Sequence, residues 1–159
     1  MLSNREFSAA VERGEYPDQV LVPLDPPFTN ANGEITNLLL ERFSSAAVIT
    51  SNPGALRANH LHRTDYHYAF VVSGSVEYFH RPAGSDKEPE RCVFTPGQLF
   101  FTPPMVEHAM FFPDGGTILT LARNIRDTAH HEEDVVRVEL VRVVTDDDGS
   151  KRAVPVGAE

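Results

Sequence analysis

The apolar residues of this chain follow a helical period only near the N-terminus. Phe7, Ala10 and Val11 recur at the spacing of one helical face. Ser3, with a glutamate three residues later, forms a capping box ahead of them. The pattern therefore predicts one short helix over Ser3–Arg13.

Short apolar runs replace the helical period after this segment, and Pro, Gly, Asn and Asp separate them. Many short strands with turn residues at near-regular intervals favour a sandwich or barrel over alternating strand–helix units. We therefore expect an all-β fold. The predicted strands are Val20–Leu24, Glu34–Phe43, Ala46–Thr50, Leu56–His62, Tyr66–Val72, Ser75–Phe79, Cys92–Thr95, Leu99–Thr102, His108–Phe112 and Thr117–Ala122.

The C-terminal part predicts one more strand and a polar tail. Apolar and charged residues alternate over Asp134–Thr145, as they do in a half-exposed strand. Residues 146–159 form a polar turn and tail, in which Ala153–Val156 is a final edge strand. No internal repeat divides the chain. We expect a single domain over residues 1–159, with its core at about 18–145.

Composition narrows the class of partner. Fourteen Lys and Arg against 23 Asp and Glu give a net charge of −9, which disfavours nucleic acids and anionic membrane surfaces. No apolar run is long enough to cross a bilayer, and Met1–Pro17 lacks the apolar segment of a signal peptide. Cys92 is the only cysteine, which excludes an internal disulfide. We expect a cytoplasmic protein that binds a small-molecule substrate, with no nucleic acid and no membrane as partner.

Histidines are the residues that suggest chemistry. Three of the seven lie close together, at His60, His62 and His67. Alternate residues of a strand point to the same face, so His60 and His62 present two imidazoles side by side. His108 follows a second Gly- and Pro-rich turn, from which a neighbouring strand can bring it opposite this pair. Because neutral imidazole is the commonest ligand for transition metals, the pattern favours a metal site.

The segments that hold these histidines resemble the two sequence motifs of the cupins. Gly54–Gly74 (GALRANHLHRTDYHYAFVVSG) is similar to the first motif, in which a glycine, His-x-His, a further ligand and a second glycine follow at set intervals. Gly97–His108 (GQLFFTPPMVEH) is similar to the second, with its glycine, proline and histidine in matching places. The resemblance covers about the central third of the chain.

This resemblance implies both a fold and a site. The fold is a double-stranded β-helix, or jelly-roll barrel, which the short N-terminal helix packs against from outside. The site is one divalent transition metal, and imidazole suits Fe, Zn, Ni, Cu or Mn. The implied metal ligands are His60, His62, His67 and His108.

One departure from the cupin pattern touches the chemistry. The family usually has Glu at the place of His67, so this site would contain four neutral ligands. Four imidazoles leave the +2 charge of the metal undiminished, which favours Lewis-acid polarisation of a carbonyl or activation of bound water. The alternative is a three-histidine site from which His67 is turned away.

Two further side chains are candidates for catalysis. Glu107 adjoins His108 and is either an acid, a base or an orienting partner, or else a solvent-facing turn carboxylate. Tyr66 is either a proton donor inside the barrel or a sheet aromatic. The run His130–Glu133 (HHEE) differs from the H-E-x-x-H order of a metalloprotease, and we expect a solvated loop there.

The sequence thus predicts a metal-dependent cupin enzyme that acts on a small oxygen-bearing molecule by isomerase, epimerase, lyase or cyclase chemistry. An oxygen-dependent dioxygenase and a non-catalytic binding or sensor protein are the alternatives. We expect an aromatic-lined cavity around the metal. Cupins commonly pair through exposed sheet edges, and Val135–Val144 predicts a long unpaired edge strand, so we expect a homodimer.

Overall fold

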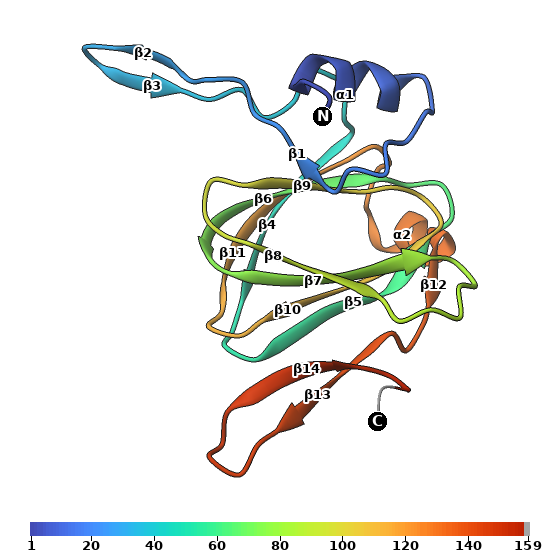
Figure 1. Cartoon of the computed structure of the whole chain (residues 1–159). Helices are drawn as coiled ribbons and strands as arrows, with labels where there is room; N and C mark the ends of the chain where they lie inside the picture. Colours follow the sequence, from blue (N-terminus) through green and yellow to red (C-terminus); the bar gives the residue numbers. More distant parts are fainter. Residues whose placement is uncertain (158–159) are drawn as a thin grey trace.

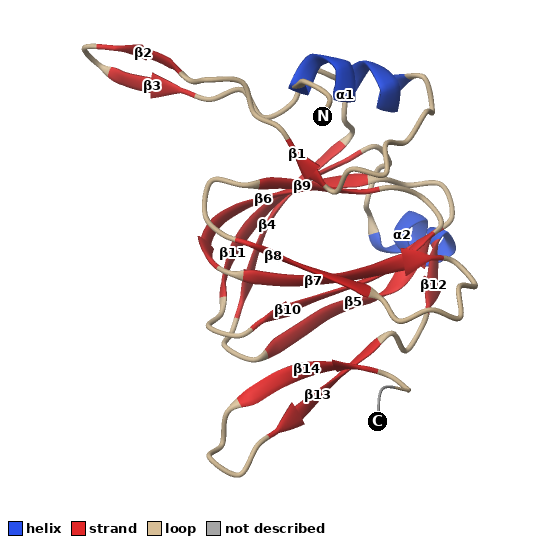
Figure 2. Ribbon diagram, in the orientation of Figure 1, coloured by secondary structure: helices blue, strands red, loops and turns tan. Residues whose placement is uncertain are grey.

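Two five-stranded antiparallel sheets face each other in the computed structural model, which describes residues 1–157 (Figures 1 and 2). The first sheet contains, in order, β1 (Leu21–Val22), β9 (Leu99–Thr102), β6 (His67–Gly74), β11 (Gly116–Ala122) and β4 (Ser45–Ser51). The second contains β12 (Val135–Arg137), β5 (Ala55–His62), β10 (Val106–Phe112), β7 (Val76–Pro82) and β8 (Glu90–Phe94). The predicted all-β fold is confirmed, and the strands predicted between Ala46 and Ala122 match the observed ones to within a few residues at each end.

Alternate residues of each strand point inward and fill the interior of the barrel. Phe100 and Phe112 belong to the cluster between the sheets, where Phe94 stacks on Phe100 with ring centroids 4.5 Å apart. Their neighbours Phe101 and Phe111 point the other way and belong to clusters on the outer faces. Because successive residues of a strand face opposite sides, each Phe-Phe pair contributes one ring to the interior.

The N-terminal helix α1 (Asn4–Glu12) covers the outer face of the first sheet (Figure 1). Its capping box is present: the Ser3 hydroxyl accepts from the backbone N–H of Glu6, and the Glu6 carboxylate accepts from the backbone N–H of Ser3 at 2.8 Å. The ring of Phe7 lies edge-on to Phe101, with centroids 5.3 Å apart. The predicted helix is confirmed.

The region after β11 differs from its prediction. Residues 128–134 form a second helix, α2 (Thr128–Asp134), capped by Asp127, where we expected a solvated loop. None of its residues is buried, so it carries no apolar stripe that the sequence could have shown. The strand predicted over Asp134–Thr145 is also wrong. It divides into β12, which pairs with β5, and β13 (Val141–Thr145), which pairs with β14 (Lys151–Pro155).

The division of that strand has a local cause. The side chain of Asn59 in β5 donates to the carbonyl of Val141 at 2.8 Å and accepts from its backbone N–H at 3.1 Å. β12 ends at Arg137, and beyond it these side-chain bonds replace strand pairing with β5 and satisfy the backbone of Val141 where β13 begins. The long unpaired edge on which we based the homodimer is therefore absent from the described residues.

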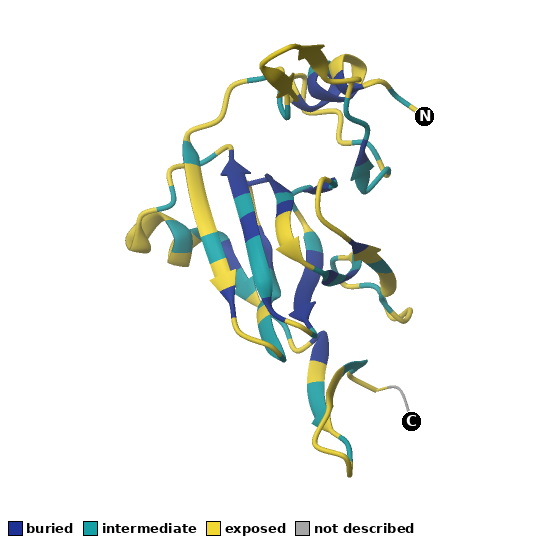
Figure 3. Cartoon of the chain, turned by 90° about the vertical axis from the view of Figure 1, so that its left-hand side faces the viewer, coloured by how far each residue is buried: buried dark blue, intermediate teal, exposed yellow. Residues whose placement is uncertain are grey.

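A β-hairpin projects from the barrel as an arm. It consists of β2 (Phe28–Asn30) and β3 (Gly33–Ile35), and both strands are exposed along their whole length (Figures 1 and 3). The strand predicted over Glu34–Phe43 is wrong beyond Ile35, because the chain continues without regular structure toward β4. Neither helix of the described chain has the length and apolar character needed to cross a membrane.

Candidate metal centre

The pairing of β5 with β10 places the first two histidines of the site. His60 and His108 are opposite each other in the register. A bulge then follows, since Ala109 pairs with Ala58 and leaves Asn59 as the extra residue. Ala58 and Asn59 both have positive φ, at 67° and 55°. The bulge turns the Asn59 amide toward Val141 and keeps His60 on the interior face.

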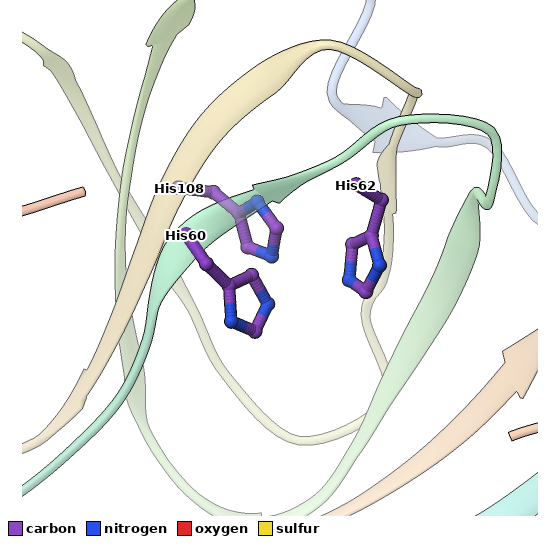
Figure 4. A group of neighbouring side chains, drawn as sticks. All are labelled: His60, His62 and His108. Carbon is purple, nitrogen blue, oxygen red and sulfur yellow. The ribbon is translucent and has the colours of Figure 1, made fainter. Parts of the chain in front are cut away.

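Three imidazoles come together at this end of the barrel (Figure 4). One ligand nitrogen of each of His60, His62 and His108 lies within 4.8 Å of the others. The ring centroid of His60 is 4.8 Å from those of both His62 and His108. This arrangement can converge on a single ion with modest side-chain rotation, as three-histidine sites do.

The remaining nitrogens of two of these rings are already satisfied. Nδ1 of His62 lies 3.2 Å from the carboxylate of Asp134, and Nδ1 of His108 lies 3.0 Å from the carbonyl oxygen of Val106. Nδ1 is therefore the protonated nitrogen, and Nε2 carries the lone pair. Nε2 of His108 is buried and has no hydrogen-bond partner within residues 1–157. Such outer partners fix the tautomer of a metal-ligating histidine, so the donor set fits a transition metal.

Burial keeps the three rings neutral. It lowers the pKa of His60, His62 and His108 to about 3 each. The positive charge of Arg126 lowers the pKa of both His60 and His62 further. A neutral imidazole has a free lone pair, which is the form that binds metal.

His67 lies against the trio, outside the group of ligand nitrogens that lie within 4.8 Å of one another. Its ring centroid is 5.4 Å from that of His108 and 5.7 Å from that of His62, similar to the 5.6 Å between the rings of His62 and His108. Its Nδ1 lies 3.1 Å from Nη2 of Arg126, and its Nε2 is buried without a hydrogen-bond partner in the described chain. Coordination by all four histidines stays a prediction.

Glu107 and Tyr66 are not brought together with the histidines. Glu107 pairs with Arg81 in the register and accepts from Arg81 Nε at 2.6 Å, on the face of β10 opposite to His108. Tyr66 donates its hydroxyl proton to Glu41 at 3.1 Å and packs in the cluster beneath α1. Their catalytic roles stay predictions, and these contacts lend them no support.

Comparison with known proteins identifies the architecture. No family model matches the sequence, and no curated protein matches it. Solved structures do match. QdtA, a 3,4-ketoisomerase from Thermoanaerobacterium thermosaccharolyticum solved with TDP, is 22% identical, with a TM-score of 0.58 over 70% of this chain and 82% of QdtA. A 3,4-ketoisomerase from Helicobacter canadensis is 17% identical, with a TM-score of 0.59 over 70% of this chain and 85% of its own.

A third match is the epimerase RmlC from Legionella pneumophila, solved with dTDP-4-keto-L-rhamnose. It is 13% identical, with a TM-score of 0.56 over 72% of this chain and 69% of RmlC. The fold is that of the cupins. At these identities the likeness shows the fold alone, and it confirms the barrel that the two motifs implied.

Several residues of the cupin barrel that surround the trio were missed by sequence reasoning. Asp134 binds His62 across 72 positions, and Asp65 binds Arg126 across 61. His80 pairs with His108 in the register and stacks on Tyr78 with ring centroids 5.2 Å apart. His80 is two positions after Tyr78 on the same strand, so the two side chains point to the same face. This spacing was the feature of the sequence that could have indicated an inward-facing ring.

A pocket of about 630 Å³ opens beside the side chains of Tyr78 and His80. Its inner wall contains Tyr78 and His80, its rim contains Lys87, and residues 16–20 close the other side. Tyr78 is 6.3 Å from His108 between ring centroids, so the pocket ends one side chain away from the trio. Its volume is that of a small-molecule site.

Proposed function

We propose that this cupin is a metal-dependent enzyme that isomerises or epimerises a small oxygen-bearing sugar. The observation that carries the proposal is the trio of buried neutral imidazoles, His60, His62 and His108. The adjoining pocket offers room for a substrate. The likeness to QdtA and to RmlC supports the substrate class, because QdtA was solved with TDP and RmlC with a dTDP-linked keto sugar.

The chemistry follows from the charge and position of these groups. A divalent ion at the trio would polarise a carbonyl oxygen and so acidify the hydrogens on the neighbouring carbon. The side chains of the pocket would orient the substrate. His80, which is opposite His108 in the register, lines this pocket.

Deuterium exchange tests the proposal. The protein, purified without oxygen and analysed for metal, is incubated in D2O with TDP-4-keto-6-deoxyglucose and followed by NMR. We expect about one metal per chain and solvent deuterium incorporated next to the carbonyl. His60→Ala with His62→Ala should abolish both, whereas the matched control His130→Ala, in exposed α2, should retain both.

The same experiment separates the alternatives. Metal that persists undiminished without His60 and His62 would contradict the proposed centre. Oxygen consumption without deuterium exchange would favour the dioxygenase, and substrate binding with neither would favour a binding protein.

We also propose that the chain forms a homodimer through its projecting arm. Phe28 and Ile35 pair across the arm and are 62% and 61% exposed. Two large apolar side chains at this exposure favour a contact with another molecule. The same chain offers a matching surface, since β4 is an open sheet edge on which Val48 is 71% exposed. An arm and a receiving edge on one chain suit a two-fold arrangement, in which each copy supplies both.

A further inference from the structure

Arg126 places a permanent positive charge between two of the four histidines. It lies in the loop between β11 and α2, and its Nη2 is 3.1 Å from Nδ1 of His67 and 3.5 Å from Nε2 of His62. Its Nε donates to Asp65 at 2.8 Å. Asp65 is 2% exposed and also accepts from the backbone N–H of Asn124, which holds the guanidinium in place.

This contact fixes the tautomer of His67. A guanidinium has N–H donors and no acceptor, so Nδ1 of His67 must be the acceptor. The proton of the neutral ring is then on Nε2. That nitrogen is buried without a partner in the described chain, beside the trio. In this state His67 offers an N–H donor and has no lone pair left for a metal.

We propose that Arg126 keeps His67 out of the coordination shell, so that the ion is held by three histidines and His67 stands beside it as a hydrogen-bond donor. The inference rests on the proposed metal centre and concerns its coordination. The carboxylate of Asp65 holds the Arg126 guanidinium against Nδ1 of His67, at a shorter distance than to Nε2 of His62. The same guanidinium repels a divalent cation and so restrains the affinity of the whole site.

Removing Arg126 should therefore release His67 as a fourth ligand. Co²⁺ is the probe, because its affinity can be measured against a competing chelator and its visible absorption reports the coordination number. The variants are His67→Ala, Arg126→Met and the double variant. Arg123→Met is the matched control, because Arg123 lies on the same loop and contacts the Thr64 carbonyl instead of a histidine.

The expected pattern is one of non-additivity. In the parent protein, His67→Ala should change the affinity for Co²⁺ by less than about threefold and leave the absorption spectrum in place. Arg126→Met should raise the affinity by about tenfold or more, the scale on which outer-shell partners act, and alter the spectrum. Adding His67→Ala to Arg126→Met should remove the spectral change and most of the gain. Arg123→Met should resemble the parent.

Several results would overturn the inference. A large loss of Co²⁺ affinity in His67→Ala alone would make His67 a ligand of the parent site. A gain of Co²⁺ affinity in Arg126→Met that persists when His67→Ala is added would mean that removing the positive charge alone raises the affinity, without His67 as a ligand. Failure of the parent protein to bind Co²⁺ would instead defeat the proposed metal centre, and the inference with it.

Loss of Arg126 also leaves the buried carboxylate of Asp65 unpaired, which can destabilise the fold. The variant Asp65→Asn with Arg126→Met removes both charges and keeps an oxygen for the Asn124 amide. It should show the same gain in affinity and the same dependence on His67. Absence of that gain in a folded double variant would likewise overturn the inference.

Discussion

Asp134 and His62 join the end of α2 to β5 through a carboxylate–imidazole contact of 3.2 Å. The same carboxylate accepts from the backbone N–H and the hydroxyl of Thr64, at 2.8 and 2.7 Å, and from the backbone N–H of Asp65. Burial raises the pKa of Asp134, but these hydrogen bonds outweigh it and leave the pKa below its ordinary value. An ionised carboxylate therefore orients the His62 ring.

Replacing this carboxylate should weaken metal binding while the fold persists. Asp134→Asn keeps an oxygen for Thr64 but places a neutral amide opposite His62. We expect the affinity for Zn²⁺, measured by chelator competition, to fall by about tenfold. Glu133→Gln, which removes the neighbouring exposed charge, is the control and should bind Zn²⁺ like the parent. Equal affinities in the two variants would show that Asp134 does not orient a ligand.

Two glycines with the same backbone conformation should respond differently to alanine. Gly74 and Gly84 have φ of 76° and 75°, so alanine is equally strained at both. A Cβ at Gly74 would lie 2.1 Å from the carbonyl oxygen of Gly115, where the β6–β7 and β10–β11 turns meet, whereas nothing lies within 4 Å at Gly84.

We therefore expect Gly84→Ala to lower the free energy of unfolding by about 1 kcal/mol, the cost of the left-handed conformation. Gly74→Ala should lower it by about 3 kcal/mol or more, because the two turns must separate. Urea denaturation measures both. Similar losses would mean that the contact between the turns relaxes without cost.

Glu41 provides a pH-dependent test of the packing beneath α1. Burial raises its pKa above the ordinary value of 4.5, against the hydrogen bonds from Tyr68 and Tyr66. A carboxyl with a raised pKa holds its proton more tightly in the folded state, so it reduces stability above that pKa and no longer does so below 4.5.

Glu41→Gln should therefore melt at a higher temperature than the parent at pH 8. The difference should shrink as the pH falls through the raised pKa and vanish near 4.5. Thermal unfolding across this range measures it. A difference that is constant with pH would assign the effect to packing instead of charge.

The projecting arm should decide the oligomeric state. Phe28→Ser with Ile35→Ser removes both exposed apolar side chains while leaving the hairpin backbone intact. We expect the parent to sediment as a dimer and this variant as a monomer, with unchanged circular dichroism. The control Thr29→Ser alters the neighbouring position of the same strand and should remain dimeric. A monomeric parent would refute the proposed assembly without affecting the fold.

The alternation of residues along single strands, which the sequence shows directly, determined which side chains point toward the interior of this protein. Alternation at His60 and His62, and the matching motif at His108, predicted the three side chains that meet. Strand alternation also places one ring of each Phe-Phe pair in the interior and the other on an outer face. These features depend on residues a few positions apart, where the period of a strand fixes the direction of each side chain.

Contacts between distant segments were decided only by the tertiary structure. Arg126 reaches His67 across 59 positions, Asp134 reaches His62 across 72, and Asn59 reaches Val141 across 82. Each partner lies in a loop, at a helix end or at a bulge, where no period fixes the direction of the side chain. Which charge stands next to His67 therefore depends on how the loops pack on the finished barrel.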